Sequence, residues 1–364
     1  MVARMDDGYL VSGIQQVGVG VQDMAEAFRW YRRHFGLDIP VFEDEGEAAL
    51  MLPYTGGLPQ SRKAVLAVNL QGGGGLEIWQ YSRRRPRAPE FDVQLGDLGI
   101  FGARVKARDV HAAHAWLRGR GVELLGPVQQ DPAGEPGFFA RDPFGLTFQI
   151  VSGEGWFARG RGPTGGVSGA LIGVAQMERS LQLYRDILGY DLLLYDRQGV
   201  FGDLAALPGG QQPVRRVLLA HSRPRSGAFS ALLGPSRLEL VQALEREPRR
   251  IFAGRFWGDL GFIHLCFDVR GMKGLKRRCE AAGFPFTVDT AQAFLMGEAS
   301  GRFAYLEDPG GTLVELVETY RLAILRKLGW FLDLRRRSPE KRLPGWMLRS
   351  LAFNRVRDRG ESPK

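Results

Sequence analysis

The stretch GIQQVGVGVQDMAEAFRWYRRHFGLDI (residues 13–39) decides the fold, because a related stretch, SGALIGVAQMERSLQLYRDILGYDL, returns at 168–192. Each begins with a short alternating run that is typical of a half-buried strand. Each continues as a helix with Tyr-Arg near its centre and a glycine at its end. Asp23 stands where an N-cap belongs, and Gly36 and Gly189 stand where helix-ending glycines belong. A strand followed by a helix is therefore predicted twice.

Two further pairs of segments repeat in the same order. ARDPFGLTFQIV (140–151) parallels LEDPGGTLVELV (306–317). IFGARVKARDVHAAHAWLRGRGVEL (100–124) parallels FIHLCFDVRGMKGLKRRCEAAGFPF (262–286). The chain is thus a tandem duplication, and each copy contains two units of one strand, one helix and three strands.

The fourfold pattern, with Asp-Pro-x-Gly before the last strand, resembles the vicinal oxygen chelate superfamily. That superfamily includes glyoxalase I, methylmalonyl-CoA epimerase, extradiol dioxygenases and bleomycin-resistance proteins. The resemblance implies an α+β fold of four βαβββ modules in two tandem glyoxalase-like domains, at 10–155 and 166–320. A basic helical tail at 321–364 follows them.

Members of this superfamily hold a divalent metal with side chains from the first and last strand of each paired module. In chain order the positions are Gln16, Glu77, Gly102, Gln149, Gly169, Glu239, His264 and Glu315. Pairing the modules within each copy gives no complete ligand set. Pairing module one with module four gives Gln16, Glu77, His264 and Glu315, which resembles the Gln/Glu/His/Glu set of some glyoxalase I enzymes. We expect one metal site from the outer modules and a degenerate site from the inner ones.

One imidazole, two carboxylates and an amide oxygen suit Zn²⁺, Ni²⁺, Co²⁺, Mn²⁺ or Fe²⁺. Such an ion acts as a Lewis acid on a carbonyl oxygen, and a nearby carboxylate can remove a proton α to that carbonyl. By family analogy Glu315 is the first candidate base and Glu77 the second. The alternative is structural: His264 as a core residue, and both acids on the solvent face of their strands.

The resemblance implies a metal-dependent lyase or isomerase of the glyoxalase type that acts on a small molecule. Glyoxalase I binds glutathione through residues whose positions are Gly20, Tyr81 and Leu260 here, so the glutathione clamp is absent. An extradiol dioxygenase needs two histidines, which disfavours ring cleavage, whereas an epimerase stays open. The alternative of another class is a metal-free protein of the bleomycin-resistance type that binds a small molecule.

Charge is concentrated at the C-terminal end. The chain has 364 residues, with 49 Lys and Arg against 40 Asp and Glu, and a net charge of +9. Residues 321–364 hold thirteen of these cations and four of the acids, so the preceding part is neutral on balance. Two cysteines are too few for a disulfide framework, and no secretory signal or long apolar run is present. These features favour a cytoplasmic protein.

The tail predicts two helices. Leu322, Leu325, Leu328 and Leu332 have helical spacing, and Pro344 begins a second candidate, PGWMLRSLAF. The two helices either pack on the body with a solvated basic face or attach peripherally to an anionic membrane. Nucleic acid is unlikely as a partner, because no nucleic-acid motif accompanies the charge. The sequence does not indicate an oligomeric state.

Overall fold

The computed structural model describes residues 8–160, 162–290, 294–296, 299–325 and 330–357. The first copy contains β1 (Leu10–Gly20), α1 (Met24–Phe35), β2 (Ile39–Glu47), η1 (Leu52–Tyr54), β3 (Ser61–Val68), β4 (Gly75–Tyr81), β5 (Gly99–Ala107), α2 (Val110–Arg118), β6 (Glu123–Leu124), β7 (Gln129–Gln130), β8 (Pro136–Arg141) and β9 (Thr147–Ser152).

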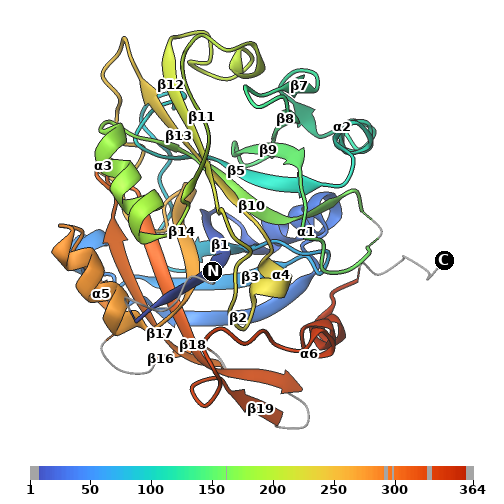
Figure 1. Cartoon of the computed structure of the whole chain (residues 1–364), viewed down its shortest axis with the longest axis vertical. Helices are drawn as coiled ribbons and strands as arrows, with labels where there is room; N and C mark the ends of the chain where they lie inside the picture. Colours follow the sequence, from blue (N-terminus) through green and yellow to red (C-terminus); the bar gives the residue numbers. More distant parts are fainter. Residues whose placement is uncertain (1–7, 161, 291–293, 297–298, 326–329, 358–364) are drawn as a thin grey trace.

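The second copy and the tail contain β10 (Thr164–Gly173), α3 (Met177–Leu181), η2 (Gln182–Ile187), β11 (Leu192–Gly199), η3 (Gly202–Leu204), β12 (Val214–Ala220), α4 (Ser230–Leu233), β13 (Arg237–Ala243), β14 (Gly261–Arg270), α5 (Met272–Ala281), β15 (Val288–Asp289), β16 (Phe294–Met296), β17 (Ala299–Glu307), β18 (Leu313–Leu325), β19 (Trp330–Asp333), α6 (Gly345–Arg349) and η5 (Ser350–Asn354). The predicted α+β fold of four βαβββ modules is confirmed (Figure 1).

Helix α1 forms where the sequence predicts it. The Asp23 carboxylate accepts a hydrogen bond from the Glu26 amide at 2.9 Å, which satisfies one of the free donors at the helix start. Gly36 ends the helix with φ of 64°, a left-handed conformation that glycine adopts without strain. The face that includes Ala27, Tyr31 and Phe35 is buried. Local signals and packing therefore agree on both ends of this helix.

The modules pair in the crossed manner that the sequence predicts. Within the described residues, modules one and four form a ten-stranded sheet, in the order β15-β17-β18-β14-β1-β4-β3-β2 with β16 and β19 beside it. Modules two and three form a nine-stranded sheet, in the order β11-β12-β13-β10-β5-β9-β8-β6 with β7 beside it. In each sheet the first strands of two modules, β1 with β14 and β5 with β10, lie antiparallel at the centre.

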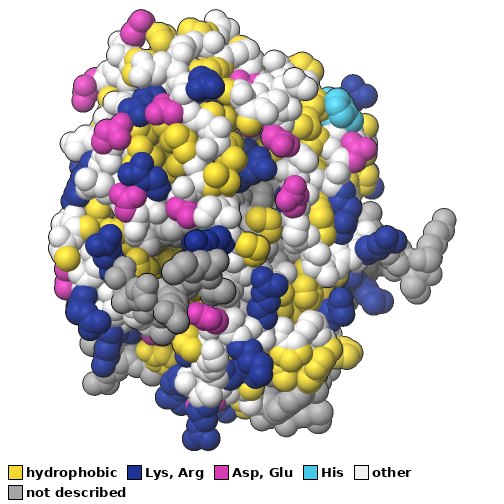
Figure 2. Space-filling model, in the orientation of Figure 1, with side chains coloured by type: hydrophobic (Ala, Val, Ile, Leu, Met, Phe, Trp, Pro, Cys, Tyr) yellow, Lys and Arg dark blue, Asp and Glu magenta, His cyan; other side chains and the backbone are white. Residues whose placement is uncertain are grey.

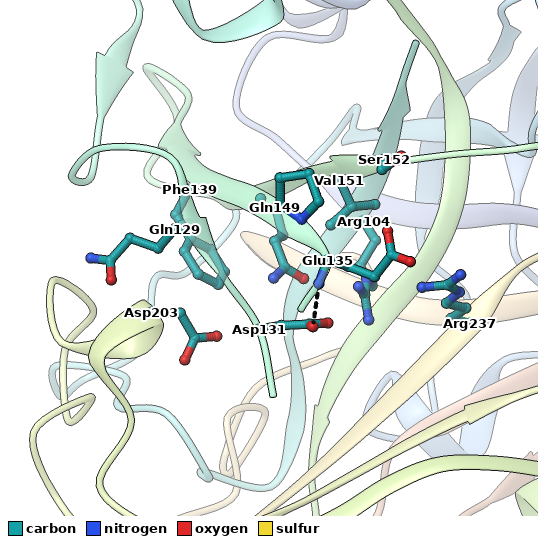
Figure 3. Close-up of a pocket in the computed structure, with 12 residues that line it drawn as sticks. Arg104, Gln129, Asp131, Glu135, Phe139, Gln149, Val151, Ser152, Asp203 and Arg237 are labelled. Atoms are coloured by element: carbon teal, nitrogen blue, oxygen red, sulfur yellow. Dashed lines mark hydrogen bonds between the residues drawn. The ribbon is translucent and has the colours of Figure 1, made fainter. Parts of the chain in front are cut away.

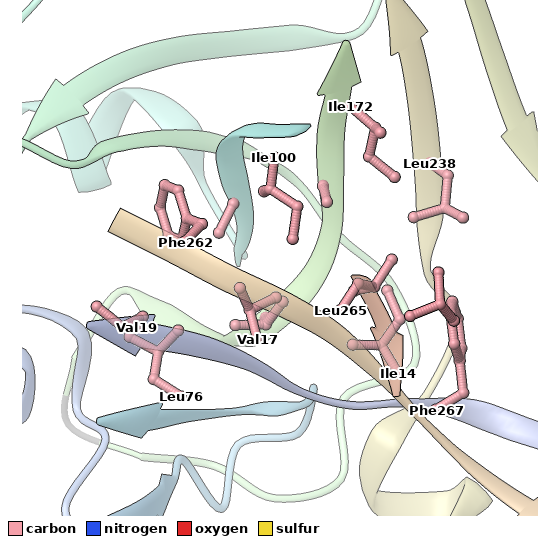
Figure 4. Packing of buried hydrophobic residues seen from close by; sticks show 14 of the residues in the cluster. Ile14, Val17, Val19, Leu76, Ile100, Ile172, Leu238, Phe262, Leu265 and Phe267 are labelled. Atoms are coloured by element: carbon pink, nitrogen blue, oxygen red, sulfur yellow. The ribbon is translucent and has the colours of Figure 1, made fainter. Parts of the chain in front are cut away.

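The main hydrophobic core lies between the two sheets and under the helices (Figure 4). Val17 and Val19 of β1 belong to it, as do Leu265 of β14 and Ile172 of β10. Gln16 and Gly18 alternate with Val17 and Val19 along β1, so they lie on the other face of the ten-stranded sheet. That face is the one that carries the candidate site.

The Asp-Pro-x-Gly turns are tied to helices of the preceding module. The Tyr31 hydroxyl of α1 donates to Asp142 at 2.6 Å, and the Tyr184 hydroxyl of η2 donates to Asp308 at 3.0 Å. Burial raises the pKa of each of these two carboxyls to about 6, although the hydrogen bonds that they accept oppose the shift. The motif that carried the family resemblance thus holds the two modules of each copy together.

The first helix predicted in the tail is wrong where the structure describes it. Strand β18 continues beyond residue 320 to Leu325 and pairs with β19, with Arg321 opposite Asp333 and Leu322 opposite Leu332. Leu328, which completed the predicted apolar stripe, lies outside the described residues. An open sheet edge offers hydrogen-bond partners to the backbone of an extended segment, whereas a short isolated helix is only marginally stable. Pairing at the sheet edge therefore overrides a weak helical pattern.

The second predicted helix is confirmed by α6, and the tail packs on the body. Leu334, Leu343 and Leu348 are buried against Ile39 and neighbouring residues of the body. The Leu343 amide donates to the Ala228 carbonyl at 2.9 Å. Of the helices in the described residues, none has both the length and the apolar character needed to cross a bilayer.

Candidate metal centre

Four neighbouring strands carry the four residues of the predicted ligand set. Gln16 lies on β1, Glu77 on β4, His264 on β14 and Glu315 on β18, and the order of these strands in the sheet is β18-β14-β1-β4. All four side chains are buried, and their exposed fractions run from 0% for His264 to 7% for Glu315. The structure thus brings together residues that are up to 299 positions apart in the chain.

The two acids do not lie on a solvent face. Leu76 and Ile78 flank Glu77 and belong to the core between the sheets. Glu315 has the same arrangement, with apolar neighbours in that core. The carboxylates therefore point to the opposite face, where aromatic side chains and the segment before β14 cover them. The structural alternative for the acids is wrong in this respect.

The His264 imidazole stands between the two carboxylates. Its Nε2 atom lies 3.2 Å from Glu77 Oε2 and 3.1 Å from Glu315 Oε2. Gln16 Nε2 donates to the same two oxygens over 3.5 and 3.4 Å. The ligand atoms of the two acids and the histidine all lie within 4.8 Å of one another. Convergence of this kind is the arrangement that a divalent ion requires.

Unpartnered atoms support the fit of a metal. Both ring nitrogens of His264 and the Oε1 atom of Gln16 are buried without a hydrogen-bond partner. Buried polar atoms without a partner are uncommon in folded proteins. A half-turn of the Gln16 amide would present Oε1 to the centre in place of Nε2, because the two ends of the group have the same shape. The donor set then has one nitrogen and three oxygens.

The charges at the centre are coupled. Burial alone would lower the pKa of His264, but the carboxylates of Glu315 and Glu77 raise it to about 9. Burial tends to raise the pKa of Glu315, but the His264 imidazolium holds it below its ordinary value. Without a metal, the positive charge of the protonated imidazole therefore offsets part of the negative charge of the two carboxylates. A bound metal would displace this proton, since only the neutral ring offers a lone pair.

Glycine at position 18 makes room for the imidazole. Gly18 lies opposite His264 in β14 and beside Glu77 in β4. A Cβ atom at this position would stand only 2.4 Å from His264 Cε1 and 2.6 Å from its Nδ1. The alternating glycines of the opening sequence stretch thus serve the site as well as the strand. The sequence pattern did not predict this role of Gly18.

Aromatic rings form the wall around the centre. The Tyr305 ring stands edge-on to the His264 ring at 5.6 Å, and the Trp257 ring stacks near it at 6.3 Å. Trp79 packs against Trp257 at 4.2 Å between ring centroids. Trp257 was not predicted, because it precedes β14 in a turn and carries no motif. Trp257 comes near His264 only because the segment before β14 folds over the sheet.

Gly20 of β1 and Tyr81 of β4, two positions that the family resemblance assigned to a glutathione clamp, contact the segment before β14. A Cβ atom at Gly20 would stand 2.0 Å from the Asp259 carbonyl oxygen. The Tyr81 hydroxyl donates a short hydrogen bond to the Trp257 carbonyl. Arg84 binds Asp259 at 2.8 Å and fixes the same segment. These residues serve the closure of the segment over the sheet.

Among their described residues, the inner modules hold no comparable ligand set. Strand registers place Gly169 beside Arg237 as Gln16 lies beside Gly75, which confirms the alignment of the two sheets at this point. Glu239 is present and buried, but it binds Arg216 Nε at 2.6 Å. An arginine of β12 therefore neutralises the acid that corresponds to Glu77 in the other sheet.

Comparisons with known proteins agree with this fold. A family profile described as the Glyoxalase/Bleomycin resistance protein/Dioxygenase superfamily matches residues 13–150 and 166–316. The chain therefore belongs to this superfamily. No curated protein matches its sequence closely enough to be counted as a relative.

Solved structures share the fold at low identity. Glyoxalase I from Zea mays is 14% identical with a TM-score of 0.51, and the match covers 84% of this chain and 92% of that one. A proposed dioxygenase from Bacillus subtilis is also 14% identical, with a TM-score of 0.54 and coverage of 85% and 86%. At this identity the likeness extends to the fold and not to a particular reaction.

Proposed function

We propose that the chain is a metal-dependent lyase or isomerase of the glyoxalase type. Its metal would be held by Gln16, Glu77, His264 and Glu315, and its substrate would be a small carbonyl compound without a glutathione group. One observation carries the proposal: a buried imidazole stands 3.1–3.2 Å from two carboxylates that have no other cation within ion-pairing distance in the described residues. A divalent ion such as Zn²⁺, Ni²⁺, Co²⁺, Mn²⁺ or Fe²⁺ would act there as a Lewis acid.

The acids supply the proton-transfer chemistry in this proposal. Glu315 also lies against Cys266 and Tyr305, whose side chains lower its pKa further, so it is held in the ionised form. An ionised carboxylate in a buried site can accept a proton from the carbon next to a carbonyl. The protonated Glu315 can then return this proton to the neighbouring atom, and Glu77, on the other side of His264, is the second candidate for the base.

Metal analysis of a histidine variant tests the proposal. The His264→Ala variant should lose bound divalent metal after dialysis against metal-free buffer, as measured by elemental analysis. His221→Ala is the matched control, since His221 is also largely buried and its Nδ1 bonds only to the Gly189 carbonyl. Equal metal content in wild type and His264→Ala would overturn the ligand assignment.

A second experiment separates the enzyme from a binding protein. Aromatic walls that include Trp79 and Trp257 suit a metal-free protein that sequesters a small molecule, so this alternative has its own support. Hydroxyacetone in D₂O is a simple probe, because removal and return of the proton next to its carbonyl incorporates deuterium. The enzyme proposal predicts incorporation that falls in Glu315→Gln. Incorporation equal to that of the metal salt alone would favour the binding protein.

We also propose that the tail attaches to an anionic membrane surface. The support comes from α6 and η5, where Trp346 is 53% and Phe353 is 80% exposed. Arg349 is exposed on the same short segment, and Lys and Arg side chains flank an apolar patch near α6 (Figure 2). Aromatic and basic side chains together are typical of proteins that bind the interface of a bilayer.

Vesicle flotation tests this attachment. The double variant Trp346→Ser, Phe353→Ser is preferable to removal of the tail. Truncation would remove Leu343 and Leu348 and expose the residues of the body that they cover, such as Ile39. Wild type should float with vesicles that contain phosphatidylserine, and the double variant should not. Equal flotation of both proteins would reject the proposal.

A further inference from the structure

The nine-stranded sheet has a pocket on its outer face, away from the core between the sheets (Figure 3). Residues of β5, β7, β8, β9, η3 and β13 line it, together with the turn at 131–135. Gln149 of β9 lines the pocket and stands at the position that Glu315 has in the other sheet. The pocket thus lies where the inner modules would have held a metal.

Arg104 occupies the space that a ligand side chain leaves open. A Cβ atom at Gly169 would stand 3.0 Å from Arg104 Cδ, so the glycine lets the arginine stem pass. The side chain is only 2% exposed although it carries a full charge. A buried cationic group therefore lies between the strands that correspond to the ligand strands of the other sheet.

The buried arginine is not saturated with partners. Its nearest acid is Glu239, whose Oε2 atom lies 3.6 Å from Arg104 Nη1, and that separation is too long for a hydrogen bond. Arg104 Nε and Nη1, Gln149 Oε1 and Glu239 Oε2 are all buried without a hydrogen-bond partner. A guanidinium buried in this state is costly unless another molecule accepts its hydrogen bonds.

The charges around Arg104 compensate one another, and Arg237 is a further cation beside them. Arg216 binds Glu239 at 2.6 Å and Asp203 at 2.8 Å, so these three and Arg104 form a neutral set. Arg237 lies beside Arg104 in the pocket wall (Figure 3). It forms no ion pair within 4.0 Å among the described residues. Arg104 and Arg237 thus both line the pocket, and Arg104 offers two buried donors without a partner there.

Acidic residues on the rim restrict the charge of a ligand. Asp131 and Glu135 also line the pocket, and the Glu135 amide fixes the Asp131 carboxylate at 3.0 Å (Figure 3). These carboxylates repel any anion, and they repel one with two or more charges more strongly than a monocarboxylate. A single carboxylate can instead make paired hydrogen bonds to guanidinium groups.

We propose that this pocket is a second ligand site, which binds a small monocarboxylate through Arg104 and Arg237. The site is separate from the metal centre and does not depend on its chemistry. It gives the inner modules a binding function in place of the metal function that they lack.

Calorimetric titration of the full chain at constant ionic strength tests the site. The probes are acetate, lactate and benzoate, with inorganic phosphate for comparison. At least one carboxylate should bind saturably, and Arg237→Met should weaken it by about tenfold or more, as expected for loss of a charged hydrogen bond. Arg237→Met is preferred to a change at Arg104, because Arg237 is only partly buried and its loss leaves the Arg216 pairs intact.

Two control variants decide where the carboxylate binds. Arg197→Met removes an exposed arginine of β11 that donates to the Asp196 carbonyl and does not line the pocket, and it should bind as wild type does. His264→Ala should also bind as wild type, even if it loses metal. No saturable binding of any of the three carboxylates, equal binding by Arg237→Met, tighter binding of phosphate, or loss of binding in His264→Ala would each overturn the proposal.

Discussion

Replacement of Gly18 by alanine should disturb the metal centre through a single methyl group. The new Cβ atom would stand 2.4, 2.6 and 2.8 Å from three atoms of the His264 ring. Ordinary contacts of a Cβ atom begin near 3.4 Å, so the ring would have to shift by about 1 Å or the strands would have to separate. The ring is fully buried between β1 and β14, and it has little room to retreat.

The size of the effect follows from this displacement. Overpacking of a buried contact costs about 1–3 kcal/mol of folding free energy. A ligand that leaves its position by that distance should weaken metal affinity by about 10–100-fold, which is the loss seen when the support of a ligand is removed. The folded protein should therefore survive while its metal affinity falls.

Competition of the protein with a chromophoric chelator measures the affinity, and urea unfolding measures the stability. Gly46→Ala is the matched control, because a Cβ atom at Gly46 of β2 would meet no heavy atom within 4 Å. The control should bind metal as wild type does. Wild-type metal affinity in Gly18→Ala, with the fold intact, would refute the assignment of His264 as a ligand.

Three further outcomes concern stability and pH. Tyr31→Phe should lower the free energy of unfolding by about 1–3 kcal/mol in urea, because the buried Asp142 carboxylate loses a donor at 2.6 Å; an unchanged midpoint would contradict this role. Burial raises the pKa of folded Asp142 to about 6, whereas an unfolded aspartate titrates near about 3.9. The folded state then holds more protons between these values, so the stability of wild type relative to Asp142→Asn should fall as pH rises from about 4 to 6; a flat difference would count against the raised pKa. Leu348→Ala should cost about 2–5 kcal/mol, because a side chain that is 1% exposed is truncated in the tail; a loss below the error of the urea measurement would show that the tail does not pack.

The internal repeat of the sequence predicted most of the fold. Strand–helix patterns and the Asp-Pro-x-Gly turns recur with the modules, so one reading of 13–39 is supported by three others. Crossed pairing followed from the ligand residues, because only the outer modules offered a histidine and two acids together. The local pattern and the long-range pattern therefore agreed for this part of the chain.

The tail shows where a local pattern fails. The leucines at 322–332 fit a helix, but residues 322–325 continue β18 and pair with β19 at the edge of the sheet. Sequence periodicity does not report which backbone edges stand open nearby. The sequence itself holds one residue that argues against a helix, Gly329, since glycine inside a helix costs about 1 kcal/mol of helix stability relative to alanine.

Tertiary contacts explain the residues that sequence reasoning missed. Trp257 reaches the centre because the segment before β14 folds back across the sheet. Arg104 lies in a strand that reads as apolar alternation, and its burial depends on Gly169 in another module. Neither partner is visible to a pattern read along one strand.

An anomalous-scattering map of crystals of the full chain, grown with a divalent metal, tests the central claim most directly. The account predicts one strong peak within coordination distance of Gln16, Glu77, His264 and Glu315, with none at the Arg104 pocket. A peak confined to other residues, or a fully metal-loaded protein with Gln16 and His264 turned away from the ion, would contradict it.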